Sequence, residues 1–428
     1  MTEPAITELE QWLPFVHCHG IGPRTIHQLL NGFDSPEAIL RASDSKLTSA
    51  GLSQKKVTAL RNTDQSGINR DIEWYKASED RHIITYSCAS YPPLLKQIAD
   101  PPLVLYVRGD LEVLSTPQLA IVGSRKPSRS AAVHATEMAA QLCAYGLTIC
   151  SGLAIGVDAC AHRGALQAEG LTVAVTATGL DRVYPAAHQS LAREIVQTGA
   201  IVSEFPIGTS PKPAYFPRRN RIISGLCYGT LVVEAALKSG TLTTAAHATE
   251  QSREVFAIPG SIDNPQSRGC HALLRNGATL VESIEDILIQ LAPLLPTELP
   301  TALPTALPTS TEFEKTNDAN RVHGGNVTGT ATNEQPQPPI IENPQSKPQP
   351  EQDKKKADEG PSLKPENYRN TSDMQKVLNA FDYTPLPLDA IVDATGLDIV
   401  TITNLAFDLE LSGAIAAVAG GKYVKTKQ

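Results

Sequence analysis

The feature that most constrains the fold of this chain is a regular alternation of short apolar runs with longer helical stretches between residues 119 and 276. The apolar runs predict strands at 119–122, 147–150, 171–177, 200–203, 229–233 and 254–258. The stretches between and after them predict helices at 128–145, 157–169, 188–198, 218–226, 241–252 and 268–276. Such alternation is typical of an extended Rossmann-like α/β fold, a doubly wound, mostly parallel sheet with helices on both faces. Ligands of these sheets bind beyond the carboxyl ends of the strands.

The predicted sheet domain covers residues 76–292 and is preceded by a small helical region, residues 1–75. In that region His19-Gly20-Ile21-Gly22-Pro23-Arg24 resembles the turn of a helix-hairpin-helix or SAM-like domain. Backbone N–H groups of such a turn can bind a DNA phosphate at a helix N-terminus. The alternative is a small helical bundle in which the glycines only cap helices.

The sequence after residue 292 changes character. Residues 293–370 repeat Leu-Pro-Thr and are then rich in Pro, Gln, Asn and Lys, which predicts a disordered linker. Residues 371–428 predict three helices and a glycine-tipped hairpin, the order of a winged helix. Its third helix, from Asp398 to Glu410, holds three acidic residues and no Lys or Arg. Because DNA would repel such a helix, we expect this domain to bind protein instead.

Composition narrows the class of protein. The seven cysteines have no metal-binding CxxC spacing, and no run of about 18 apolar residues is present, so we expect a cytoplasmic protein with reduced thiols, no metal and no membrane contact. The net charge of −8 is unevenly divided, because residues 293–428 hold 18 acidic and 12 basic side chains. That leaves only −2 for the first 292 residues, where positive charge gathers in patches.

Two glycine turns are expected at one edge of the sheet. Gly123-Ser124-Arg125 follows the strand at 119–122, just before a helix that should begin near Ser128. Backbone N–H groups and a helix N-terminus there attract an anion, and Arg125 adds a guanidinium. Ser151-Gly152 follows the next strand. A glycine loop after a first strand is weak evidence for an anion site when it stands alone. The second glycine turn at Ser151-Gly152, beside it at the sheet edge, strengthens that evidence.

The strongest local signal is Phe216-Pro217-Arg218-Arg219-Asn220-Arg221. Lys212 lies upstream, and no Asp or Glu occurs from residue 206 to 222. Arginines crowded at a helix start repel one another and the helix dipole unless an anion is bound. Tyr215 and Phe216 are placed to stack on bases. The alternative is a solvated basic face with the aromatic rings in the core.

A further phosphate cradle is predicted at Lys238-Ser239-Gly240-Thr241, which opens a helix after the strand at 229–233. The alternative is an ordinary helix N-cap, and the spacing is not that of a P-loop. Asp158 and His162, one helical turn apart and near Ser151, raise a catalytic alternative. A carboxylate in a first helical turn is also favoured by the helix dipole, so we expect no catalytic residue and no cofactor.

Read in order, seven motifs make residues 80–292 resemble the DNA processing protein A (DprA/Smf) family. They are VGSR (122–125), SGLAIGVDACAH (151–162), TGLDRVYP (178–185), VSEFP (202–206), FPRRNRIISGL (216–226), VVEAALKSGTLTTA (232–245) and FAIPG (256–260). The resemblance implies a dimeric protein of natural transformation that binds and protects single-stranded DNA and helps to load the RecA recombinase, without catalysis.

The resemblance also implies a positive pocket for the DNA backbone. By motif position its residues are Gly123, Ser124, Arg125, Arg219, Asn220 and Arg221, while Arg218 fills a variable position. Charge and location add Lys212 and the loop of Lys238, Ser239, Gly240 and Thr241. The second glycine turn adds Ser151 and Gly152, and base stacking adds Phe216.

Two other functions remain open. One is a nucleotide-processing enzyme of the lysine-decarboxylase-like, or phosphoribohydrolase, type, with Glu234 as a candidate residue. Those enzymes carry a Pro-Gly-Gly-x-Gly-Thr loop, and the stretch from Lys238 to Thr241 lacks its double glycine. The other is an adaptor that uses the winged helix to bring proteins together.

Overall fold

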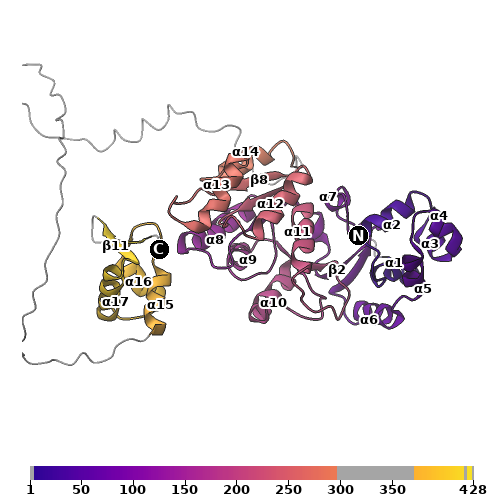
Figure 1. The fold of residues 1–428 in the computed structure, drawn as a ribbon, viewed down its shortest axis with the longest axis horizontal. Helices are drawn as coiled ribbons and strands as arrows, with labels where there is room; N and C mark the ends of the chain where they lie inside the picture. Colours follow the sequence, from indigo (N-terminus) through magenta and orange to yellow (C-terminus); the bar gives the residue numbers. More distant parts are fainter. Residues whose placement is uncertain (1–3, 296–370, 419–421, 427–428) are drawn as a thin grey trace, which may run out of the picture. The chain divides into compact units, whose positions relative to one another are not determined.

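The computed structural model describes residues 4–295, 371–418 and 422–426 of the chain (Figure 1). Residues 296–370, where a disordered linker is predicted, lie outside the described residues. The parts before and after them are therefore considered separately.

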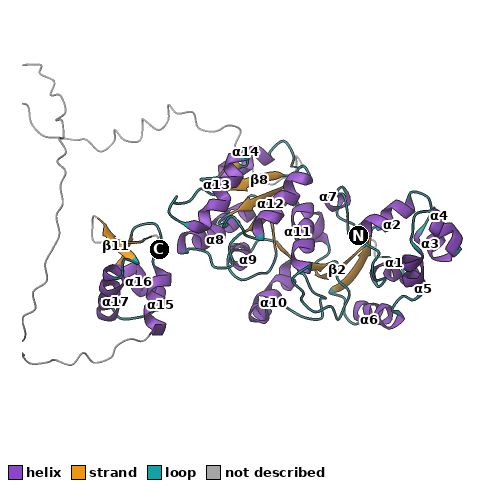
Figure 2. Cartoon of the chain, in the orientation of Figure 1, coloured by secondary structure: helices purple, strands orange, loops and turns teal. Residues whose placement is uncertain are grey.

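The centre of residues 4–295 is a nine-stranded sheet with the order β1-β2-β6-β5-β4-β3-β7-β8-β9 (Figure 2). The strands are β1 (Arg81–Thr85), β2 (Val104–Gly109), β3 (Gln118–Val122), β4 (Thr148–Ser151), β5 (Thr172–Val175), β6 (Ala200–Ser203), β7 (Gly229–Val232), β8 (Glu254–Ala257) and β9 (Thr279–Leu280). From β6 to β9 all neighbours are parallel, while β2 is antiparallel to both β1 and β6. The predicted mostly parallel, Rossmann-like sheet is confirmed.

Helices cover both faces of this sheet. They are α7 (Pro93–Lys96), α8 (Arg129–Ala144), α9 (Val157–Gln167), α10 (Gln189–Thr198), α11 (Tyr215–Leu226), α12 (Thr241–Glu250), α13 (Arg268–Arg275) and α14 (Ile284–Leu291). Alternate strand residues pack on opposite faces, as in β3, where Leu119 meets α8 and α14 while Ala120 faces the side of α11. The apolar runs are long because strands covered on both faces have no solvent side.

Six helices precede the sheet, in agreement with the predicted helical region. They are α1 (Ile6–Val16), α2 (Pro23–Leu30), α3 (Pro36–Arg41), α4 (Asp44–Ser49), α5 (Gln54–Arg61) and α6 (Gln65–Lys76). Their apolar side chains form one continuous core with sheet residues such as Ile83 and Tyr106. The buried carboxylate of Asp71 on α6 accepts hydrogen bonds from the Tyr106 hydroxyl and from the Ile207 N–H at 3.0 Å, and it lies 2.7 Å from Nε2 of His17. The helices are thus joined to the sheet by both apolar and polar contacts.

The strand order determines where a ligand can bind. After β3 the chain moves to β4 on one side, whereas β7 lies on the other side of β3 and continues to β8. The carboxyl ends of β3 and β7 therefore flank the switch point, where the departing loops separate and leave a crevice. The loops that meet there begin at Gly123 and Val233.

The C-terminal domain is small and has its own core. It contains α15 (Thr371–Ala380), β10 (Leu386–Pro387), α16 (Leu388–Thr395), α17 (Ile399–Leu411), β11 (Ile415–Val418) and β12 (Lys422–Lys425). The strands form an antiparallel sheet in the order β10-β12-β11, which confirms the winged-helix topology, although the hairpin tip at 419–421 is not described. In the described part of the chain, no single helix is long and apolar enough to cross a membrane; α16 and α17 pass that test only as a pair bent by 113°.

Candidate functional site

A cavity of about 790 Å³ lies at the switch point. Three segments form it: the loop after β3, the loop before α12 and one face of α11. Its polar and charged lining residues include Ser124, Arg125, Lys126, Asp158, Arg219, Asn220, Lys238, Ser239, Thr241, Thr243, Thr244 and Gln266. The sequence-predicted loops at Gly123 and Lys238 are thus brought together, as expected from the fold.

The loop after β3 is held in a fixed shape. The Ser124 hydroxyl accepts a hydrogen bond from the Lys126 N–H at 3.1 Å, and the Ser124 carbonyl accepts one from Val157 N–H. A side chain at Gly123 would lie 2.6 Å from Val157, so only glycine allows α9 to pack this closely. Arg125 and Lys126 are exposed and form no ion pair among residues 4–295. Their charges are available to an anion in the cavity.

The loop before α12 is joined to the loop after β3. The Thr241 hydroxyl donates a hydrogen bond to the Gly123 carbonyl at 2.9 Å and receives one from the Ser239 hydroxyl at 3.0 Å. The Asn220 amide bonds the Gly240 carbonyl and the Thr243 hydroxyl, at 3.3 and 2.8 Å. These contacts make Ser239, Gly240 and Thr241 supports of the cavity wall. Lys238 remains exposed at its rim.

Helix α11 begins at Tyr215, three residues before the predicted start, so the whole FPRRNR motif is helical. A helix turns about 100° per residue, which places neighbouring side chains in different directions. Phe216, Arg219, Asn220 and Ile223 share one face and line the cavity. Arg218 and Arg221, three residues apart, point to another side.

Arg219 lies at the buried base of the cavity. Its Nη1 donates to the Val175 carbonyl at 2.7 Å, while its Nε has no hydrogen-bond partner. Gly152 makes room for it, because a methyl group there would lie 1.8 Å from Nη1. Burial lowers the pKa of the Arg219 guanidinium, and the nearby Asp158 charge opposes that shift. The positive charge of this guanidinium at the base of the cavity attracts an anion that enters it.

Arg218 and Arg221 correct the expectation that all three arginines face one groove. Arg221 is 5% exposed, its Nη2 lies 2.5 Å from Oε2 of Glu204, and its Nε lies 3.4 Å from Asp100. Nη2 of Arg218 lies 2.8 Å from the same Glu204 oxygen, and this side chain is 45% exposed. Glu204 lies just before the stretch from residue 206 to 222, which contains no Asp or Glu. The sequence therefore suggested that Arg218 and Arg221 have no acidic partner, although both are paired with Glu204. Neither side chain lines the cavity.

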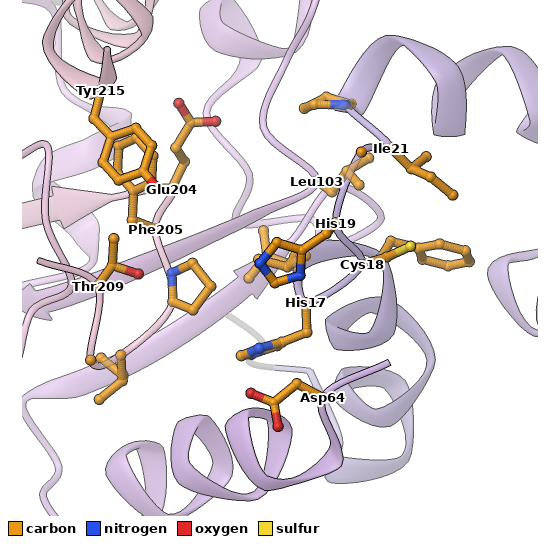
Figure 3. A pocket seen from close by; sticks show the side chains of 18 of the residues that line it. His17, Cys18, His19, Ile21, Asp64, Leu103, Glu204, Phe205, Thr209 and Tyr215 are labelled. Atoms are coloured by element: carbon orange, nitrogen blue, oxygen red, sulfur yellow. The ribbon is translucent and has the colours of Figure 1, made fainter. Parts of the chain in front are cut away.

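A separate pocket of about 370 Å³ lies on this other side of α11 (Figure 3). Glu204, Phe205 and Tyr215 stand on one side of it and the turn after α1, with His19, on the other. The Phe205 and Tyr215 rings stack with centroids 4.5 Å apart. Lys212 is exposed, lies 5.5 Å from the Tyr215 ring centre and does not line the cavity at the switch point.

Ser151 and Gly152 also have structural partners. The buried Ser151 hydroxyl donates to the Ile121 carbonyl at 2.6 Å, and the Gly152 N–H donates to Asp158 at 3.1 Å. Asp158 accepts a second hydrogen bond from Ala154 N–H at 3.3 Å, and burial raises the pKa of its carboxyl. The expectation that Ser151 and Gly152 offer donors to a ligand is therefore corrected. Both residues instead shape the wall around Arg219.

The catalytic alternative at Asp158 has no geometric support. Nδ1 of His162 lies 2.7 Å from the Thr172 hydroxyl, away from Asp158, whose partners are backbone N–H groups. Burial lowers the pKa of His162 to about 3, so the imidazole is neutral at physiological pH. A triad needs an imidazole that bonds both the carboxylate and the hydroxyl, and Nδ1 of His162 contacts the Thr172 hydroxyl instead.

Glu234, the candidate residue of the enzyme alternative, is buried behind the cavity wall. Its carboxylate accepts hydrogen bonds from Ser128 N–H at 3.2 Å and from the Asn264 amide at 3.2 Å. Burial raises the pKa of this carboxyl, and the bond from Ser128 opposes the shift. Glu234 does not line the cavity. It fastens the start of α8 to the end of β7.

Sequence reasoning missed two residues of the cavity wall. Lys126 adds a cation next to Arg125, and its position directly after the glycine loop was a usable signal. Tyr184 lies with its ring centroid 5.7 Å from that of Phe216, and Arg125 lies 5.7 Å from the centre of the Phe216 ring. Tyr184 comes from a loop 32 residues before Phe216, and no local pattern indicated this contact.

Comparisons with known proteins identify the family. Residues 82–292 match the family described as DNA recombination-mediator protein A, and residues 346–421 match the DprA winged helix domain. The chain is 44% identical over 246 residues to Protein Smf of Escherichia coli, covering 57% of this chain and 66% of that relative. It is 31% identical over 428 residues to Protein Smf of Synechocystis sp., covering 98% of this chain and 99% of that relative.

A solved structure is also similar. The X-ray structure of DNA processing protein A (DprA) from Streptococcus pneumoniae matches with a TM-score of 0.58 and 33% identity, over 68% of this chain and 99% of that one. Its match and the nearly full-length match to the Synechocystis relative agree with the motifs and the sheet topology. The chain therefore belongs to the DprA/Smf family of DNA processing proteins.

Proposed function

We propose that this protein binds single-stranded DNA through its sugar-phosphate backbone in the cavity at the switch point, and that it does so without catalytic turnover. Arg125, Lys126 and Lys238 would meet phosphates at the rim, and Arg219 would meet one at the base. Phe216 and Tyr184 stand beside them as surfaces on which a base can stack.

One observation carries this proposal: the cavity has four cationic side chains and a single acidic one among its described lining residues. That acid, Asp158, is already engaged by two backbone N–H groups and by the charge of Arg219. The cavity is thus positive although the whole chain carries −8. A positive groove with aromatic rings is the arrangement that non-specific single-strand binders use.

Arg125 and Lys238 provide the direct test, because both are exposed and neither holds the fold together. The double substitution Arg125→Ala with Lys238→Ala should weaken binding of a labelled oligo-dT about tenfold or more. The slope of log affinity against log salt concentration should become shallower by about 1.4, because each phosphate contact to a single strand contributes about 0.7 to that slope. Anisotropy titrations at several salt concentrations, with oligo-dT and a duplex of equal length, would measure both.

The matched control is Arg275→Ala with Lys55→Ala, which removes the same charge from exposed positions outside the cavity. Equal losses in both double variants would mean that binding follows net charge and not this site. A duplex bound more tightly than the single strand would also reject the proposal.

The enzyme alternative has its own test. A phosphoribohydrolase would release free base from nucleoside monophosphates, and Glu234→Gln would abolish that turnover. We expect no turnover, because the Glu234 carboxylate is held by Ser128 and Asn264 outside the cavity.

Family membership alone supports the remaining part of the proposal, that the protein acts as a dimer in natural transformation and helps to load RecA. Light scattering would test the dimer, and a monomer mass would reject it. The rate at which RecA assembles on single-stranded DNA should rise when this protein is added. An unchanged rate would reject the loading role while leaving DNA binding intact.

A further inference from the structure

We propose that the exposed face of α17 in the C-terminal domain is a docking surface for a basic, amphipathic segment of another protein. The face comprises the exposed apolar side chains of Ile399, Val400 and Phe407 together with the exposed carboxylate of Asp408, and it belongs to a helix pair, α16 and α17, that carries only acidic charge. This inference goes beyond DNA binding in the cavity and does not depend on it.

The apolar part of the face is not needed by the domain itself. Ile402, Leu405, Ala406 and Leu409 turn inward from α17 and already form the core with side chains such as Val377. Ile399, Val400 and Phe407 are 45%, 66% and 60% exposed. Val400 and Phe407 are seven residues apart, or two helical turns, so they lie on one side of α17. Apolar side chains gathered on one helix face of a small domain mark an interaction site more often than scattered ones do.

The charge of the helix pair that carries this face is uniformly negative. Residues 388–411 contain five carboxylates and no Lys, Arg or His: Asp389, Asp393, Asp398, Asp408 and Glu410. Asp398 caps α17 by accepting from Thr401 N–H at 2.9 Å, and Glu410 accepts from Ala417 N–H at 3.3 Å. Asp389, Asp393 and Asp408 have no cationic partner among the described residues. Their charges are free to attract a cation.

These charges decide the class of partner. In a winged helix the third helix is the one that enters a DNA groove, and it does so with basic side chains that neutralise phosphate. Here α17 would bring carboxylates to that groove, and like charges across an interface cost several kcal/mol. A helix with one apolar stripe and flanking Lys or Arg residues has the opposite properties. Its stripe would cover Val400 and Phe407, and its cations would meet Asp408 and its neighbours.

Full-length protein and two synthetic peptides test this surface. One labelled 18-residue peptide carries Leu on one helical face and Lys on the other, and the second has the same composition in an order without a stripe. We expect the striped peptide to bind the wild-type chain at least tenfold more tightly than the scrambled one. Val400→Ser with Phe407→Ser should remove that preference, and Asp408→Lys should weaken binding and reduce its salt dependence.

The matched control is Ile262→Ser with Leu280→Ser, two apolar residues that are 78% and 46% exposed in the sheet domain. It should bind the striped peptide as the wild type does. Because Val400, Phe407 and Asp408 are exposed, their variants should melt at the wild-type temperature. If the double serine variant melts at a lower temperature, Asp408→Lys still tests the surface.

Several results would overturn the proposal. Equal binding of the two peptides, or an unchanged preference in the serine variant, would show that only net charge attracts them. A loss of DNA affinity in the serine variant would make the face a nucleic-acid site. A drop in its mass by light scattering would make the occupant a second copy of this chain.

Discussion

Arg219 and Arg221 are two residues apart on α11, and they belong to different parts of the molecule. Arg219 lines the cavity at the switch point, and none of the ion pairs found among residues 4–295 includes it. Arg221 faces the opposite side and is held by Glu204 and Asp100. The same type of side chain is thus placed for the proposed ligand binding in one position and for an internal ion pair in the other. A cluster of arginines in a sequence therefore indicates an anion site only for those arginines that are not paired with a carboxylate inside the protein.

The largest expected effect concerns stability on the Glu204 side. Arg221→Ala should lower the free energy of unfolding by about 3–5 kcal/mol, because it breaks a buried ion pair and leaves carboxylates without their main partner. Denaturant unfolding would measure it, with Arg221→Lys as a control that retains the charge and should lose less. A loss below about 1 kcal/mol would mean that the pair is solvated and that the two sides of α11 differ less than described.

Arg219 is expected to affect binding instead. Arg219→Met keeps most of the side-chain volume but removes the charge, and should cost about 1.5–3 kcal/mol of single-strand affinity, the value of a hydrogen bond to a charged group. Anisotropy at several salt concentrations should also show a slope reduced by about 0.7. Arg221→Met, studied under conditions where it is folded, should leave the slope unchanged. If both variants reduce the slope equally, the distinction between the two faces fails.

Gly152 tests whether the position of Arg219 matters as much as its charge. Gly152→Ala places a methyl group 1.8 Å from Nη1 of Arg219 and 2.6 Å from Asp158, without changing any charge. Overpacking of this kind costs about 1–3 kcal/mol, and we expect it as lost DNA affinity or lost stability. Gly32→Ala, where the nearest atom to the added methyl group is the Leu29 carbonyl oxygen at 3.7 Å, is the control in both measurements. Wild-type values for Gly152→Ala would contradict the close fit around Arg219.

The smallest effect is expected for Arg218. Its ion pair with Glu204 is 45% exposed on the arginine side, so Arg218→Ala should change stability by at most about 1 kcal/mol. Its DNA salt slope should equal that of the wild type, because the side chain does not line the cavity. A slope reduced as much as in Arg219→Met would place the DNA path on both sides of α11.

The sequence predicted the sheet well because its strands are buried on both faces and therefore appear as unbroken apolar runs. All six predicted parallel strands are present, with shifts of one or two residues at their ends. The start of α11 was predicted three residues too late, after Pro217. Proline is tolerated in a first helical turn, where its missing N–H would have no partner. The earlier start adds Phe216 to the helix, on the same face as Arg219 and Asn220.

Other features of the site depend on contacts between distant segments. Glu204 is 17 residues from Arg221, and Asp100 is more than a hundred residues away, so no local pattern could assign these partners. The same holds for Gly152, which leaves room for the side chain of Arg219 on α11. The loops at Gly123 and Lys238 were predictable because the topology of parallel strands brings their carboxyl ends together.

The carboxylate of Asp71 has a consequence for how the N-terminal helices can be studied. It takes contacts from α1, from β2 and from the segment after β6, all without access to water. Cutting the chain at residue 76 would leave the Asp71 carboxylate of one fragment without two of its donors, and the Tyr106 hydroxyl and Ile207 N–H of the other fragment without their acceptor. The first six helices are therefore expected to melt together with the sheet in one transition, and a truncated sheet is expected to aggregate.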